Sequence, residues 1–231
     1  MKKLLLLLLC VPLLTLAQNT YVPDDNFEQE LIHLGYDNVL DDYVTTANID
    51  TITHLDVDGN DISDLTGIED FISLKFLTCH SNDLTSLDVS NNTNLEVLVC
   101  LENYIICLDI SANTALEELY CESNLLEQLN TRNGNWQNMT VIADDNNLTC
   151  VEVDNIGQAT NSWTFDGFTT ISTNCNYVNP CATVSKIQEY TSNKKLLKIT
   201  DILGREVNEK RNTPLFYIYN DGTVEKRIVI K

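Results

Sequence analysis

Basic residues are scarce over most of this 231-residue chain. Residues 18–181 hold 28 acidic side chains and only two basic ones. A surface this acidic repels phosphate backbones and anionic lipid, so nucleic acid is not expected as a partner. The balance reverses over residues 182–231, which carry ten basic and six acidic side chains. This break in composition predicts a domain boundary near residues 180–185.

The sequence also has no apolar run long enough to cross a membrane, for which about 20 residues are needed. Its longest run, residues 4–16, follows the basic start Met1-Lys2-Lys3 and ends near small Ala17. Cys10 lies inside the run rather than at its end, which argues against a lipoprotein anchor. We therefore expect residues 1–17 to be a signal peptide and the rest to be exported without a transmembrane segment.

The chain is rich in one internal repeat. Residues 84–100, "LTSLDVSNNTNLEVLVC", and residues 105–121, "IICLDISANTALEELYC", agree at nine positions with an offset of 21. The shared template, L-x-x-L-x-C-x-x-N-x-L, recurs at intervals of 21 or 22 and starts at Ile52, Leu74, Leu95, Leu116 and Asn138. It resembles the leucine-rich repeat family, which implies a solenoid with one coil per copy.

The spacing within each copy predicts a strand. Leu98 and Cys100 point inward, whereas Val97 and Val99 point outward. Stacked copies form a parallel sheet, and a coil of 21 residues leaves room only for an extended or short 3₁₀ back. One asparagine per copy should turn inward and satisfy buried main-chain groups. These are Asn60, Asn82, Asn103, Asn124 and Asn146.

A solenoid of this kind needs both ends covered. We expect an N-terminal cap over residues 18–50, repeats over residues 51–154 and a C-terminal cap over residues 155–181. In the first cap, residues 23–35 predict a helix that begins at Asp24, Asp25 or Asn26. Its apolar face comprises Phe27, Leu31 and Leu34. In the second cap, the apolar cover comprises Trp163, Phe165, Phe168 and Ile171.

The cysteines fall into two groups. Cys79, Cys100 and Cys121 share the inward position of successive copies, where Cβ atoms stack about 4.8 Å apart, too wide for a disulfide. No histidine joins them, so they are interpreted as small buried apolar groups rather than metal ligands. Cys150 and Cys175 bracket the C-terminal cap and are predicted to form a disulfide. The sequence leaves the disulfide pairing of two cysteines open. Cys181 is close enough to compete for either Cys150 or Cys175, and Cys107 has no evident partner.

The last segment predicts a small antiparallel β domain. Strands are expected at "LLKITDI", "LFYIY" and "TVEKRIVI", the last two joined by the turn Asn220-Asp221-Gly222. The segments "DILGREV", "PLFYIYNDGT" and "EKRIVIK" resemble the type A C-terminal sorting domain of the type IX secretion system. The residues that carry the motif are Asp201, Gly204, Arg205, Gly222, Lys226 and Arg227. The usual Pro-Asn-Pro element is missing, and "EYTSNKK" stands in its place.

The sorting resemblance implies passage across the outer membrane by the type IX secretion machinery. Secretion or attachment to the cell surface would follow. Residues 20–49 are similar to the start of repeat arrays that carry such sorting domains, which agrees with this interpretation.

The sequence contains no clear pattern of a catalytic site or of a metal site. His80 aligns with Asp58 on the neighbouring coil, but no outward serine or cysteine nucleophile is evident beside the pair, and we expect no enzyme. The segment "DVDGND" at residues 56–61 fails the EF-hand pattern, because its sixth position is Asp61 and its twelfth is Gly67. Turn chemistry explains it instead. No metal or cofactor is therefore expected.

Outward apolar residues indicate a binding surface. On or beside the concave face they are Phe76, His80, Val97, Val99, Leu101, Tyr104, Tyr120 and Leu125, rimmed by glutamates. The alternative is that strand propensity alone chose these residues. The sequence thus predicts a secreted or surface protein of internalin-like architecture that binds a protein or glycan. Competing hypotheses are a structural envelope component and, least supported, a hydrolase.

Overall fold

The computed structural model describes residues 18–177, 181, 196–200, 205, 207, 214–219 and 224–228. The chain divides into two compact units, with the division after Ser185. The predicted signal peptide lies outside the described residues, as do the sorting-motif residues Asp201, Gly204 and Gly222.

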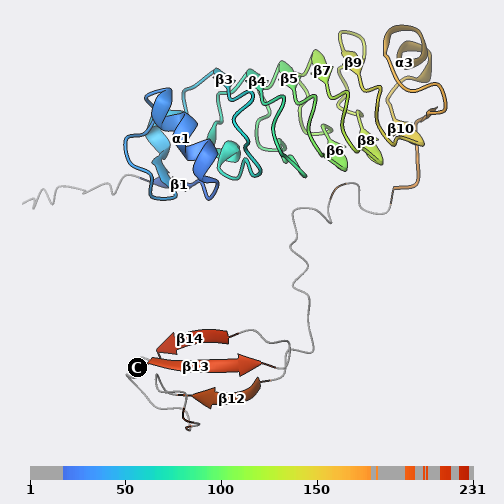
Figure 1. Ribbon diagram of the computed structural model, residues 1–231. Coiled ribbons are helices and arrows are strands. Elements are labelled where there is room, and N and C mark those ends of the chain that lie inside the picture. Colours follow the sequence, from blue (N-terminus) through green and yellow to red (C-terminus); the bar gives the residue numbers. More distant parts are fainter. Residues whose placement is uncertain are drawn as a thin grey trace, which may run out of the picture. The chain divides into compact units, whose positions relative to one another are not determined.

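A five-stranded parallel sheet forms one side of the first unit, and we call it the front sheet (Figure 1). Its strands, in order, are β3 (His54–Asp56), β4 (Phe76–Thr78), β5 (Val97–Val99), β7 (Glu118–Tyr120) and β9 (Thr140–Ile142). Leu77, Leu98 and Leu119 lie opposite one another in this ladder. The repeat of about 21 residues therefore corresponds to one coil of a parallel-sheet solenoid, as predicted.

A second parallel sheet, the back sheet, faces the opposite side (Figure 1). It comprises β6 (Cys107–Asp109), β8 (Gln128–Asn130), β10 (Cys150–Glu152) and β11 (Thr170–Ser172). An earlier coil has the 3₁₀ helix η1 (Ile68–Asp70) on its return instead. The leucines, isoleucines and valines between the two sheets are buried in one continuous core.

The predicted asparagine ladder is present at four of its five positions, whereas Asn60 is half-buried and donates to the Asp58 carbonyl. Asn82 Oδ1 accepts from the main-chain N–H groups of Asn60 and Ile62, at 3.1 and 2.9 Å. Asn103, Asn124 and Asn146 repeat this arrangement on later coils. The asparagines thus take the place of main-chain partners where the chain turns away from the front sheet.

A second asparagine ladder lies at the other end of each coil, and the sequence analysis did not predict it. Asn92 donates to the carbonyl oxygens of Ile68 and Phe71, at 2.8 and 3.2 Å. Asn113 donates in turn to the Asn92 carbonyl at 3.0 Å, and Asn133 donates to that of Asn113 at the same distance. The signal was available, because Asn92 and Asn113 match in the repeat alignment.

The amino-terminal segment lies beside β3 (Figure 1). Strands β1 (Asn19–Tyr21) and β2 (Tyr43–Thr45) pair antiparallel, and helices α1 (Asp25–His33) and α2 (Thr46–Ile49) accompany them. Phe27 of α1 packs on Phe71 of the solenoid with ring centroids 6.4 Å apart. The predicted burial of Leu34 is wrong: it is 40% exposed. Leu34 is the C-cap residue, past the last turn that faces the core.

Asp24 ties α1 to the first coil. One carboxylate oxygen accepts from the N–H groups of Asn26 and Phe27, and the other from the N–H and hydroxyl of Ser63. Burial raises the pKa of Asp24, but the hydrogen bonds from Ser63, Phe27 and Asp64 outweigh it, and the pKa lies below 3.8. The ionised form is therefore the one that the fold stabilises.

We expect Asp24→Ala to lower the free energy of unfolding by about 1–2 kcal/mol at pH 7, as is typical when an N-cap is lost. Because the folded pKa is depressed, this contribution is complete above 3.8 and disappears as the pH falls through the folded pKa. Urea titrations at pH 7 and pH 2.5 measure both parts. Asp25→Ala, one position on, is the control; an equal loss in both variants at pH 7 would contradict the assignment.

The carboxyl-terminal end of the first unit carries α3 (Ile156–Ser162). Trp163 follows it, is buried, and donates from its indole nitrogen to the Met139 carbonyl at 2.7 Å. Phe165 and Ile171 pack partly buried against the core. The prediction for Phe168 is wrong, since it is 68% exposed. It lies in the loop before β11, just after Gly167, and does not cover the core.

The second unit contains an antiparallel sheet in the order β12 (Leu196–Thr200), β13 (Pro214–Tyr219) and β14 (Val224–Ile228). Its strands coincide with the three segments that the sequence predicts. Lys226 and Arg227 lie in β14, opposite Phe216 and Leu215. The turn between β13 and β14 lies outside the described residues.

Candidate functional site

Four of the predicted binding residues lie on the outward face of the front sheet. Phe76 is opposite Val97, and Val99 is opposite Tyr120, with every side chain half-buried. Ile142 on β9 lies opposite Tyr120 and extends the row. Ile142 was not among the predicted residues, although it occupies the position of Val99 and Tyr120 in the last copy. The adjacent strands thus form one continuous aliphatic and aromatic surface, which we call the front apolar surface.

His54 adds a further ring to this surface. It stacks on Phe76 with ring centroids 4.3 Å apart and an interplanar angle of 14°. Beside it, Lys75 pairs with Glu96 at 2.6 Å. The Tyr120 hydroxyl donates to Glu118 at 3.0 Å, and this bond, followed by burial, raises the pKa of Tyr120. Glu96 therefore neutralises Lys75, the one basic residue beside these strands in the described part of the chain, and the remaining carboxylates keep the surroundings of the apolar groups negatively charged.

His80 and Leu101 lie just past the carboxyl ends of β4 and β5. His80 Nε2 is 2.8 Å from Asp58 Oδ2, and His80 Nδ1 is 3.0 Å from Ser81 Oγ. Burial raises the pKa of Asp58, and the negative charge of Asp56 adds to this effect. The hydrogen bond from the main-chain N–H of His80 opposes it. A serine hydroxyl thus lies beside the His80–Asp58 pair, which the sequence did not make evident.

Ser81 nevertheless has its hydroxyl hydrogen directed away from His80. The hydroxyl donates to Glu102 Oε2 at 2.7 Å, and the Ser81 N–H donates to the carbonyl of Leu101. A nucleophilic serine would donate to the histidine and lie beside free oxyanion donors. The network Asp58–His80–Ser81–Glu102 instead links three successive coils. This network connects the edges of the three coils and forms a polar rim next to Leu101.

Tyr104 and Leu125 do not lie on the front sheet. Each follows an inward asparagine, in the segment that leads from the front sheet to the back sheet, and each is strongly exposed, at 52% and 44%. The Leu125 N–H donates to the Ile105 carbonyl, so the two segments run side by side. They form a flank surface separate from the front apolar surface.

The three repeat cysteines are buried free thiols, as predicted. Burial, with a smaller contribution from Glu122, raises the pKa of Cys100 to about 12. Burial likewise raises the pKa of Cys79 and Cys121 well above the ordinary value. A thiol held protonated is a poor nucleophile and metal ligand, so these groups act as core side chains.

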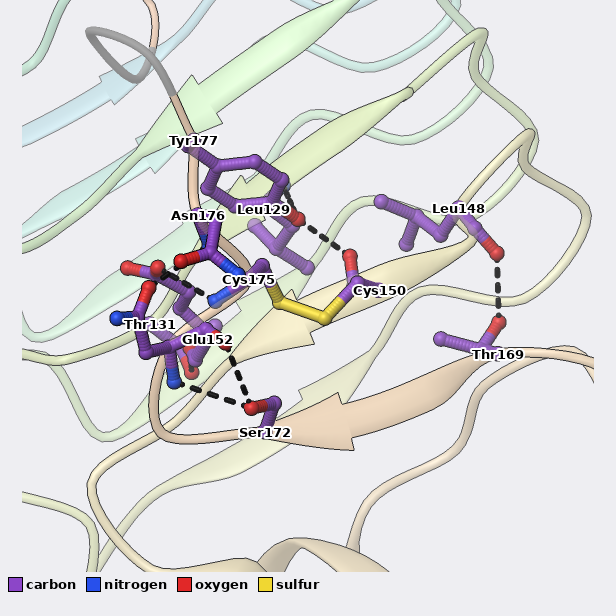
Figure 2. Close-up of a disulfide and its surroundings, with 11 residues drawn as sticks. Leu129, Thr131, Leu148, Cys150, Glu152, Thr169, Ser172, Cys175, Asn176 and Tyr177 are labelled. Carbon is purple, nitrogen blue, oxygen red and sulfur yellow. Dashed lines mark hydrogen bonds between the residues drawn. A yellow bond between two sulfur atoms is a disulfide. The ribbon is translucent and has the colours of Figure 1, made fainter.

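Two disulfides hold the end of the first unit onto the back sheet. The predicted pair Cys150–Cys175 is formed, and its surroundings are shown in Figure 2. Cys107, in β6, is joined to Cys181, 74 residues later. Cys175 and Cys181 are thus each joined to a strand of the back sheet, β10 and β6. The sequence left this second pairing open.

One acidic group among the described residues has the spacing of a metal site: Asp25, Glu28 and Asp42. The buried Glu28 carboxylate already accepts from three main-chain N–H groups, those of Asp41, Asp42 and Tyr43, at 2.9 to 3.1 Å. These bonds order the loop between α1 and β2 and account for the burial of Glu28 without an ion.

Comparison with known proteins points to one group of relatives. Over 79 residues the chain is 37% identical to Internalin J of Listeria monocytogenes serotype 4b (strain F2365), a match of 34% of this chain and 8% of that protein. The Internalin J of serovar 1/2a (strain ATCC BAA-679 / EGD-e) is 35% identical over the same length. The repeats are similar to those of Internalin J. No known protein-family profile matches the chain.

The fold shows the same similarity. The solved functional domain of InlJ from Listeria monocytogenes superposes with a TM-score of 0.53 at 29% identity, over 67% of this chain and 39% of that one. That domain includes a cysteine ladder, and Cys79, Cys100 and Cys121 are stacked on successive coils here. This chain spans less than a tenth of the Internalin J proteins it matches. The shared feature is therefore the internalin-like leucine-rich repeat solenoid.

Proposed function

We propose that this chain is a secreted or surface-attached, non-enzymatic leucine-rich repeat protein that binds an extracellular protein or glycan through its front apolar surface. The observation that carries the proposal is a pair of outward apolar rows, Phe76–Val97 and Val99–Tyr120–Ile142, which meet on β5. Large apolar side chains on the open face of a sheet favour a partner that removes them from water. The similarity to Internalin J supports a binding role.

The carboxylates around this surface indicate the charge that a partner should carry. Glu96 and Glu117 flank one edge, and Asp58, Glu102 and Glu122 follow the other. Glu118 lies opposite Val97, beside the apolar residues on the same face. A partner with an apolar centre and basic groups on both sides matches this arrangement. Because Glu102, Glu117 and Glu118 are exposed, their contribution should fall as the salt concentration rises.

The proposal is tested with Val99→Asp/Tyr120→Asp, which places two charges in the centre of the surface. The probes are immobilised peptides in which Lys or Arg flank apolar residues, together with a glycan array. We expect at least a tenfold loss of binding, and weaker binding by the unaltered chain at 0.5 M NaCl. The control is Ser90→Asp/Ser111→Asp, which adds the same charge at exposed positions away from the front sheet. Binding of every peptide and glycan at the unaltered strength in the first variant would refute the proposal.

We also propose that residues 182–231 act as a sorting domain for the type IX secretion machinery. Support comes from the motif segments and from the basic charge of this unit, which contrasts with the acidic solenoid. No helix among the described residues has the length and apolar character to span a bilayer.

A further inference from the structure

Tyr177 holds two strands of the back sheet apart. Strands β8 and β10 pair at Leu129–Val151 and Asn130–Glu152, but Gln128 and Cys150 do not pair. In an unbroken parallel ladder the Leu129 N–H would donate to the Cys150 carbonyl. Here that N–H donates to the Tyr177 hydroxyl at 3.4 Å, and the hydroxyl donates to the Cys150 carbonyl (Figure 2). A tyrosine hydroxyl thus occupies the place of one ladder hydrogen bond.

The separation of the strands coincides with a hollow of about 470 Å³. Its walls are Glu127 and Gln128 from the β8 side, Asn147 and Thr149 from the β10 side, and Tyr177 with the Cys150–Cys175 disulfide. The volume is within the range of small-ligand sites, about 300–1,000 Å³. The disulfide fixes the position of Tyr177, because Cys175 is only two residues away.

Three polar side chains in the walls of this hollow have donors and acceptors available for a ligand. Within the part of the chain that the structure describes, the side chains of Glu127, Asn147 and Thr149 make no hydrogen bond to protein. The positions of Asn147 and Thr149 are occupied by Tyr104 and Ile106 two coils earlier, and by the exposed Asp83 and Thr85 three coils earlier. The repeat itself therefore does not require this polar set.

The chemistry of the walls selects the ligand. Amide, hydroxyl and carboxylate groups offer both donors and acceptors, which match sugar hydroxyls that both donate and accept. The Tyr177 ring supplies an apolar surface for the C–H face of a pyranose. The one charge in the walls is negative, so anionic ligands are disfavoured. We propose that this hollow is a binding site for a neutral saccharide unit, separate from the front apolar surface.

The experiment measures binding of the full chain to an array of neutral oligosaccharides built from hexoses and N-acetylhexosamines, with sialylated and sulfated glycans for comparison. Hits are quantified by calorimetry. We expect a neutral glycan to bind, and Asn147→Ala/Thr149→Val to weaken it at least tenfold. The matched control is Asp83→Ala/Thr85→Val, which makes similar truncations at the equivalent flank of another coil and should leave binding unchanged. Circular dichroism and the thermal midpoint confirm that both variants fold.

Three results would overturn the proposal. They are the absence of any neutral glycan ligand, a preference for the anionic glycans, and neutral glycan binding that survives in Asn147→Ala/Thr149→Val. In the last case, loss of the same binding in Val99→Asp/Tyr120→Asp would assign it to the front apolar surface. The two proposals therefore succeed or fail separately.

Discussion

Asn103→Leu is expected to lower the free energy of unfolding by about 4 kcal/mol. The Asn103 amide donates to three main-chain carbonyl oxygens at 3.0 to 3.2 Å, those of Cys79, Cys100 and Leu101. Its Oδ1 accepts from the Leu84 N–H at 3.0 Å. Leucine has a similar size but leaves these buried groups without partners, at about 1–3 kcal/mol each before relaxation. Urea unfolding followed by circular dichroism measures the loss.

The matched control for Asn103→Leu is Asn91→Leu. Asn91 is exposed, so its replacement should change the stability by less than about 0.5 kcal/mol. If Asn103→Leu were as stable as the control, main-chain satisfaction by the ladder would not be what holds successive coils together, and the account of the fold given above would be wrong.

Removal of the Cys107–Cys181 disulfide should have an effect of similar size. The bridge closes a loop with a sequence separation of 74, and restricting the unfolded chain over that length stabilises the fold by about 4 kcal/mol. The Cys107→Ala/Cys181→Ala variant should therefore unfold at a markedly lower urea concentration. Cys150→Ala/Cys175→Ala opens a separation of only 25, and about 3 kcal/mol is expected there.

Reduction supplies the control for both cysteine variants. With a strong reductant present, the unaltered chain should lose its advantage over each of them. The buried thiols Cys79, Cys100 and Cys121 make no bridge and should not contribute to this difference. Equal stability of the oxidised chain and Cys107→Ala/Cys181→Ala would show that restriction of the unfolded chain by this bridge does not stabilise the fold.

The periodic parts of the structure were accessible from the sequence, because each coil solves the same packing problem. The spacing that places Leu98 inward and Val99 outward holds in every copy of the front sheet. Of the contacts that occur once, the short Cys150–Cys175 bridge was predicted, but contacts between distant segments were not accessible. Cys107 lies inside the repeat and its partner is 74 residues away, so no local pattern connects them.

The candidate site shows the same division. The front apolar surface follows from strand alternation, whereas the contact between His80 and Ser81 depends on a backbone conformation. Ser81 has a positive φ of 53°, which recurs before the inward asparagine of later coils at Glu102, Ser123 and Asp145. Only Ser81 among these four has a histidine beside it in the sequence, so the contact itself does not repeat. Tyr177 likewise enters the back sheet through the disulfide two residues before it, and no periodicity in the sequence encodes that insertion.

The Cys107–Cys181 bridge also determines how the molecule would carry a mechanical load. A pull on the chain beyond Cys181 would pass through the sulfur atoms directly to β6, near the middle of the solenoid. Residues 108–180 would then form a covalent side loop that bears no tension. The coils that line the hollow beside Tyr177 would keep their shape under traction while the coils ahead of β6 took the strain.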